Sequence, residues 1–203
     1  RTVRLLRQLR TTEADGADSE LSLSRLPPVR AGLVVRDNIR QRRAIERTYI
    51  HAIVNARARI DIACPYFYPG RRFRRALERA AARGVHIRLL LQGKVDYRFA
   101  ALAARVLYDG LLARGIGIFE YMPAFLHAKV AVVDGVWATV GSSNIDPFSL
   151  LLAREANVMV RDSGFARELR ADLARLWQRA GALKPVAVAG TMRDSSPPAS
   201  TGA

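Results

Sequence analysis

The sequence is short of lysine, cysteine and long apolar runs. Three of its 33 basic residues are lysine, and the rest are arginine. With Cys64 as the single cysteine, no disulfide can form within the chain, which excludes a disulfide scaffold. No stretch approaches the roughly 18 continuous apolar residues of a membrane span. No apolar run follows the basic start either, so neither a span nor a signal peptide is predicted.

What remains is a globular and strongly basic chain. Half of the 203 residues are hydrophobic, which is enough for one domain with a full core. The formal net charge of +15 creates a positive field that attracts polyanions. Nucleic acid and an anionic lipid surface both fit this field, so the charge alone does not choose between them.

Composition divides the chain into three parts. Residues 1–30 predict a linker or the end of a preceding domain: 1–10 could be one basic helical stretch, and 11–30 are rich in Thr, Asp, Ser and Gly. Residues 31–182 predict the folded domain. Residues 183–203 carry Ala, Gly, Ser and Pro without periodicity and predict a disordered tail. Because the chain does not begin with Met, we expect a fragment of a longer protein.

Within the domain, apolar runs alternate with helical patterns. A helix is expected at 37–58 with Asp37 as its N-cap, and others at 71–83, 97–114 and 165–180. Strands are expected at 32–35, 60–66, 86–91, 116–121, 128–133, 137–141 and 156–160. A βαβαβα start followed by consecutive strands predicts an α/β fold, a mixed β-sheet with helices packed on it.

The side chains that could take part in catalysis lie in one stretch. His127, Lys129 and Asp134 precede Gly141-Ser142-Ser143-Asn144, in the pattern H-x-K-x4-D-x6-G-S-x-N. On a strand, His127 and Lys129 would project from the same face. An imidazole nucleophile beside a fixed cation suits attack on a phosphodiester, because the cation neutralises charge on the phosphoryl oxygens. Ser142 and Asn144 can donate hydrogen bonds to the same oxygens.

This pattern is specific for a chain of this composition. With three His, three Lys and eleven Asp, roughly 0.002 matches to H-x-K-x4-D are expected by chance. The other histidines, His51 in a helix and His86 in a strand, have no comparable partners and are interpreted as structural. No cluster of Cys and His or of paired acids predicts a metal site.

The pattern is similar to the HKD signature of the phospholipase D superfamily. The stretch 33–162 resembles the C-terminal half of bacterial cardiolipin synthases with two such motifs. The resemblance implies a mixed β-sheet flanked by helices on both faces. The closer match is carried by Val35-Arg36-Asp37-Asn38, Pro65-Tyr66-Phe67-Tyr68-Pro69-Gly70, Leu90-Leu91-Gln92-Gly93, and Trp137-Ala138-Thr139-Val140 through Ile145-Asp146-Pro147.

The resemblance also implies a role for each residue of the catalytic set. His127 would be the nucleophile or the general acid for the leaving alcohol. Lys129 and Asn144 would bind phosphate, with Ser142 assisting. Asp134, the acid of the motif, would brace a loop. Glu155 would hold the other ring nitrogen of the histidine, although a solvated charge at a strand end is the alternative.

Three functions remain open at this stage. The first is a phosphatidyltransferase that forms cardiolipin from phosphatidylglycerol through a phosphohistidine, without metal or cofactor. The resemblance then implies an anionic phospholipid substrate, a peripheral position at the bacterial cytoplasmic membrane, and a second HKD half. That half would come from an upstream domain, which the linker-like residues 11–30 favour, or from a homodimer mate. The second is a phospholipase D-like phosphodiesterase or nuclease, and the third is a half-domain that binds anions without turnover.

Two surface features also have two interpretations each. Phe125 and Leu126, just before His127, could form an apolar lip for acyl chains or could be ordinary half-buried strand residues. The arginines that begin the helix at 71–83 could be a solvated face or an anionic lipid contact.

Overall fold

The computed structural model describes residues 29–37, 41, 43–94, 107–146 and 154–182. These residues form one eight-stranded mixed sheet in the order β1-β7-β6-β5-β2-β3-β4-β8. The strands are β1 (Arg30–Arg36), β2 (Arg59–Ala63), β3 (His86–Gln92), β4 (Gly117–Tyr121), β5 (Val130–Val133), β6 (Trp137–Gly141), β7 (Glu155–Arg161) and β8 (Gly181–Ala182). The helices are α1 (Ala44–Asn55), α2 (Arg71–Ala82) and α5 (Ser163–Trp177), and residues 107–112 are also helical.

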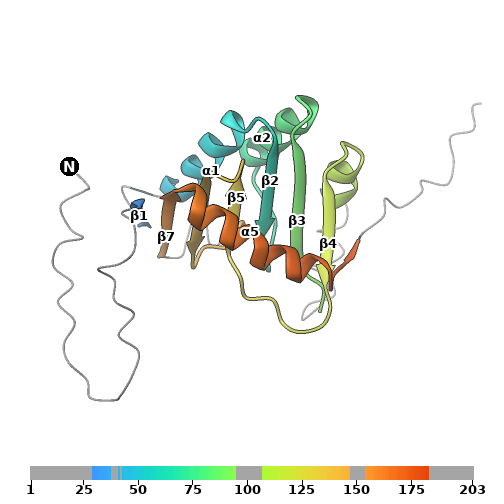
Figure 1. Ribbon diagram of the computed structural model, residues 1–203. Helices are drawn as coiled ribbons and strands as arrows, with labels where there is room; N and C mark the ends of the chain where they lie inside the picture. The colour runs from blue at the N-terminus through green and yellow to red at the C-terminus, as the bar shows by residue number, and fades with distance from the viewer. Residues whose placement is uncertain (1–28, 38–40, 42, 95–106, 147–153, 183–203) are drawn as a thin grey trace, which may run out of the picture.

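Three parallel strands lie within the sheet. β2 pairs with β3 and β3 with β4 in parallel, whereas the other neighbours pair antiparallel. Helices α1 and α2 pack on one face and α5 crosses the other, as Figure 1 shows. The expected mixed sheet with helices on both faces is therefore confirmed.

Alternation along the strands separates two cores. In β2, Ile60 and Ile62 face α1 and α2, while Ala63 faces α5. Both isoleucines are fully buried. Burial of an isoleucine contributes about 1.5–3 kcal/mol relative to exposure. The sheet is therefore fixed from both sides, which makes its edge a rigid support for functional groups.

A buried carboxylate links the sheet to α5. Asp61 is buried and lies 2.8 Å from Nε of Arg88 and 2.9 Å from Nε of Arg59. The Arg88 guanidinium in turn lies 4.2 Å from the centre of the Trp177 ring, near the end of α5. Because both oxygens of Asp61 face arginines, this acid has a structural explanation and is no candidate for catalysis.

Strands occur at each predicted position, and the helix boundaries account for the main correction. Helix α1 begins at Ala44 rather than after Asp37, so the predicted N-cap was wrong. Asp37 instead accepts a hydrogen bond from Gln41 N at 2.8 Å. Gly84 and Gly115 have positive φ just after helical segments, as their expected terminating role requires. Strand β8 was not predicted.

Three predictions lie wholly or partly outside the described residues. They are the linker at 1–30, of which only 29–30 are described, the tail at 183–203, and the helix at 97–114 before residue 107.

Candidate active site

The residues of the motif lie at the edge of the sheet that is formed by the carboxyl ends of its parallel strands. Strands β2, β3 and β4 end at this edge, and the pairs Ala63–Val130 and Gly141–Asn157 place the start of β5 and the end of β6 there too. It is the lower edge in Figure 1, and we call it the site edge. Ligands of open α/β sheets commonly bind outside the carboxyl ends of the parallel strands, so this edge is the expected place for a site.

His127 and Lys129 converge just before β5. They lie in an extended segment, not in the strand as predicted, because β5 begins at Val130. The ladder nevertheless reaches Lys129, whose carbonyl accepts from Gly141 N at 3.1 Å. Lys129 is buried as a residue, and its ammonium lies 3.4 Å from His127 Nδ1 and donates to His127 O at 3.1 Å. The His127 ring is exposed, so a cation lies beside a histidine that a substrate can reach.

Close packing fixes the turn that carries Ser142 and Asn144. A Cβ atom on Gly141 would lie 2.3 Å from Asn157 Cγ, so only glycine fits there. The buried Asn157 amide donates to Thr139 Oγ1 at 3.2 Å and accepts from Ser143 N at 3.4 Å. A satisfied buried polar network of this kind holds a turn in one conformation.

Ser142 and Glu155 contact each other at the start of β7. The Ser142 hydroxyl donates to the Glu155 carboxylate and accepts from Ala156 N. The resemblance assigns Glu155 to a ring nitrogen of His127, but here Glu155 binds Ser142, and His127 Nδ1 faces Lys129. The structure therefore places both side chains at the site edge without joining Glu155 to the histidine.

Cys64 positions the other end of the turn. Its sulfur accepts from Ile145 N at 3.2 Å and lies 3.8 Å from Asn144 Oδ1. Tyr68 N donates to Ile145 O at 2.7 Å, so the segment after β2 also holds this turn in place. Burial raises the pKa of the Cys64 thiol to about 12, which keeps it protonated and removes it as a nucleophile. No local sequence pattern predicts these hydrogen bonds.

Asp134 lies at the opposite edge of the sheet, after the far end of β5. Its carboxylate accepts from the backbone N–H groups of Arg57, Ala58 and Arg59 at 2.8–2.9 Å. It therefore holds the turn between α1 and β2 and does not reach the catalytic groups. Partial burial alone would raise the pKa of Asp134, but the three N–H groups and the Arg57 charge outweigh it and lower that pKa.

We expect Asp134→Asn to lower the free energy of unfolding by about 1–2 kcal/mol at pH 7, because the amide accepts less strongly than the carboxylate. Since the folded pKa of Asp134 is lowered, its contribution is present above its unfolded pKa of about 4 and is lost as the pH falls through the folded value. Urea unfolding from pH 7 downward measures this. If the two proteins still differed by the same free energy of unfolding at low pH, the assignment would be contradicted.

Sequence reasoning missed three residues that shape the site. Arg36 is buried and lies opposite Glu155 in the register of β1 and β7. Gln92 Oε1 accepts from Leu126 N at 2.5 Å, which ties the end of β3 to the segment before His127. Asn157 supports the turn, as described above. Arg36 and Gln92 lie in stretches that carried the resemblance, which was the only signal for them.

The described residues contain neither a cluster of metal ligands nor a membrane-spanning helix. Among those residues, no group of three or more His, Cys, Asp and Glu side chains could hold a metal ion. Within the same ranges, no helix is both long and apolar enough to cross a membrane.

Comparison with known protein families shows to which family the chain belongs. The family described as cardiolipin synthase, PLD-like domain, matches residues 49–177. The chain belongs to this family. The match begins within α1, ends with α5 and includes every residue of the H-x-K-x4-D and G-S-x-N pattern. The predicted membership of the phospholipase D superfamily is thus confirmed.

Curated relatives support this assignment over part of their own length. Cardiolipin synthase B of Escherichia coli K12 is 49% identical over 141 residues, which are 70% of this chain and 34% of that protein. Cardiolipin synthase 2 of Bacillus anthracis is 39% identical over 128 residues, which are 63% of this chain and 25% of that protein. The chain spans about a third or less of the length of these relatives.

Two solved structures share the fold. The phospholipase D family member Nuc from Salmonella typhimurium superposes with a TM-score of 0.66 at 18% identity, over 77% of this chain and 99% of that one. Phosphatidylserine synthase from Haemophilus influenzae gives 0.65 at 11% identity, over 77% of this chain and 40% of that one. At these identities the comparison establishes the fold alone.

Proposed function

We propose that this PLD-like domain is one catalytic half of a phosphatidyltransferase resembling cardiolipin synthase. The observation that carries the proposal is the Lys129 ammonium 3.4 Å from the exposed His127 ring, beside the turn that presents Ser142 and Asn144. Identity of 49% to cardiolipin synthase B supports a phospholipid rather than another phosphodiester as the substrate.

In the proposed reaction a phosphatidyl group passes through a histidine. A ring nitrogen attacks the phosphorus of phosphatidylglycerol, so a P–N bond forms and the P–O bond to glycerol breaks. The departing glycerol oxygen takes a proton from a second histidine. That histidine then removes a proton from a hydroxyl of another phosphatidylglycerol, whose oxygen attacks phosphorus and releases the first histidine. The products are cardiolipin and glycerol, and His127 supplies one of the two histidines.

The remaining side chains stabilise charge and orient the ring. Lys129 and Asn144 bind the phosphoryl oxygens and Ser142 assists, which lowers the energy of the pentacoordinate state. Glu155 contacts Ser142 in the structure. For the role that the resemblance implies, its carboxylate would have to move from Ser142 to the ring nitrogen that does not attack, where it would stabilise imidazolium. Asp134 acts only on the fold.

An exposed apolar surface beside the site supports a second half. Leu33, Val35, Val140 and Val158 are between 39% and 48% exposed, and we call them the β1–β7–β6 patch. Leu33 pairs with Val158 and Val158 with Val140, so the row crosses three strands. Val140 pairs in turn with Val130, the residue after Lys129. The row therefore reaches the end of β6, two residues before Ser142, and we propose the second HKD half as the occupant of this patch.

Hydrolysis of nucleic acid is the second candidate. The net charge of +15 favours it, since arginines neutralise backbone phosphates. The same H-x-K and G-S-x-N groups would serve, with water as the acceptor. The test therefore offers both substrates to an enzyme that carries both halves.

We expect that enzyme to convert phosphatidylglycerol to cardiolipin in excess EDTA at about its full rate, because Lys129 and Asn144 supply the charge stabilisation that a metal would provide. Thin-layer chromatography of labelled lipid and a plasmid nicking assay measure both activities in parallel. Complete loss in EDTA with rescue by Mg²⁺ or Zn²⁺ would contradict the mechanism. DNA cleavage without cardiolipin would favour the second candidate.

A further inference from the structure

The loop between β4 and β5 exposes large apolar side chains. Phe125 is 65% exposed and Met122 is 53% exposed. Of the two residues interpreted together from the sequence, Leu126 is buried, so only Phe125 faces outward. Solvent exposure of an aromatic ring and a long apolar side chain on one short loop is unfavourable unless something covers them.

The base of this loop is held firmly. Leu126 joins the core on the α5 face and its N–H donates to Gln92, while Gly93 N donates to Tyr121 O at 3.1 Å. A Cβ atom on Gly93 would lie 2.5 Å from Met122 Sδ, which shows how closely the two segments pack. Phe125 and Met122 are therefore presented outward from a fixed support.

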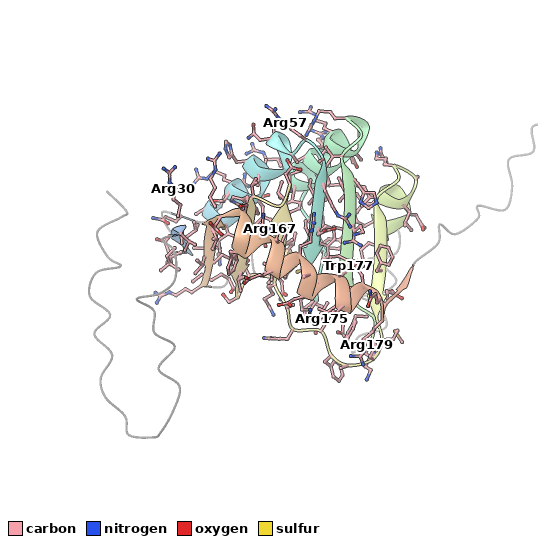
Figure 2. The ribbon with its side chains drawn as sticks, in the orientation of Figure 1. Arg30, Arg57, Arg167, Arg175, Trp177 and Arg179 are labelled. Carbon is pink, nitrogen blue, oxygen red and sulfur yellow. The ribbon has the colours of Figure 1, made fainter. Side chains whose placement is uncertain are left out.

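Two basic residues lie near the apolar side chains of this loop. Lys94 Nζ lies 5.5 Å from the centre of the Phe125 ring. Gly181 pairs with Glu120, so Arg179, two residues earlier, lies near the end of β4 where the loop begins. Figure 2 shows Arg179 and Arg175 at the site edge and Arg57 at the opposite edge. Apolar side chains flanked by lysine and arginine match the boundary between acyl chains and anionic headgroups.

The position of the loop fits a lipid surface better than a second copy of the chain. Two copies each carry a net charge of +15 and would bring like charges together at this tip. Phe125 lies two residues before His127, a span of at most about 7 Å. Apolar groups of interfacial proteins enter the headgroup and acyl boundary by about 5–10 Å. Insertion of Phe125 would therefore bring His127 to the depth of the lipid phosphates.

We propose that Met122, Phe125, Lys94 and Arg179 form a membrane-docking surface that seats the domain on an anionic lipid bilayer with His127 facing the headgroups. The inference rests on the proposed function for its substrate. These four residues would bring the site to that substrate.

Vesicle flotation of the full chain tests the apolar part. The probes are vesicles of phosphatidylglycerol and phosphatidylcholine in equal parts, and vesicles of phosphatidylcholine alone. We expect the double variant Met122→Ser, Phe125→Ser to bind the anionic vesicles at least about tenfold more weakly. The matched control is Val136→Ser, an exposed valine in the β5–β6 turn at the opposite edge, which should bind as wild type. Circular dichroism verifies folding, and unchanged binding by a folded double variant overturns the proposal.

Charge reversal tests the basic part. Lys94→Glu and Arg179→Glu should weaken binding to anionic vesicles severalfold, whereas Arg57→Glu, with the same change in net charge, should have less than a twofold effect. Equal losses at all three positions would mean diffuse attraction by the whole chain and would overturn the proposal. Flotation needs no turnover. Loss of binding in the variants therefore upholds the surface even if the complete enzyme makes no cardiolipin, and unchanged binding refutes it even if cardiolipin is made.

Discussion

His127→Asn should lower kcat by about 10³-fold or more in an enzyme that carries both HKD halves. The residue forms a covalent bond to phosphorus or protonates the leaving alcohol, and loss of either role costs far more than one hydrogen bond. The fold should be unaffected, because the ring is exposed and its contacts are with Lys129.

The matched control is His51→Asn. His51 is also exposed, but it lies in α1 and its side chain contacts Asn55 within the same helix. Turnover of this variant should stay within about twofold of wild type. If His127→Asn retained more than a few per cent of activity with its circular dichroism unchanged, neither role for His127 could stand.

The second large effect concerns the need for two HKD halves for activity. We expect residues 1–203 alone to be inactive as a monomer, because the leaving alkoxide needs a general acid on the opposite side of phosphorus from the nucleophile. The chain has two other histidines, and neither can serve. His51 lies within α1, and His86 pairs with Arg59 at the edge that holds Asp134, away from the site edge.

Sedimentation coupled to the lipid assay tests this requirement. Activity should appear only when the chain dimerises or when the other half is added. Val158→Asp in the β1–β7–β6 patch should abolish that gain, while Val136→Asp, which is also exposed but lies at the opposite edge, should preserve it. A monomeric chain with full activity would refute the two-half account. A complete two-half assembly that binds phospholipid without turnover would instead leave the domain as an anion-binding module.

Local patterns made most of the fold predictable. The apolar runs of β3 and β5 and the helix-ending Gly84 follow directly from neighbouring residues. The start of α1 was misplaced because Asp37 can cap a turn as readily as a helix. Strand β8 was not predicted because it is two residues long and forms by pairing with β4, which no local pattern reveals.

The site was predictable as a set of residues but not as a geometry. Spacing along the chain placed His127 beside Lys129, and the structure brings their side chains together. The hydrogen bonds of Asn157 and Cys64 join segments 14 and 81 residues apart in the sequence, so local pattern could not indicate them. The Glu155 contact with Ser142 likewise depends on how β6 and β7 pair.

The central claim is that a phosphatidyl group passes through a histidine of an HKD half. The most direct test incubates the two-half enzyme with ³²P-labelled phosphatidylglycerol, quenches in alkali and locates the label by peptide mapping. The account predicts an acid-labile, alkali-stable label on His127 or on the matching histidine of the other half, absent when both are replaced by Asn. Label on a serine or carboxylate, or turnover with no labelled histidine in a rapid quench, would contradict it.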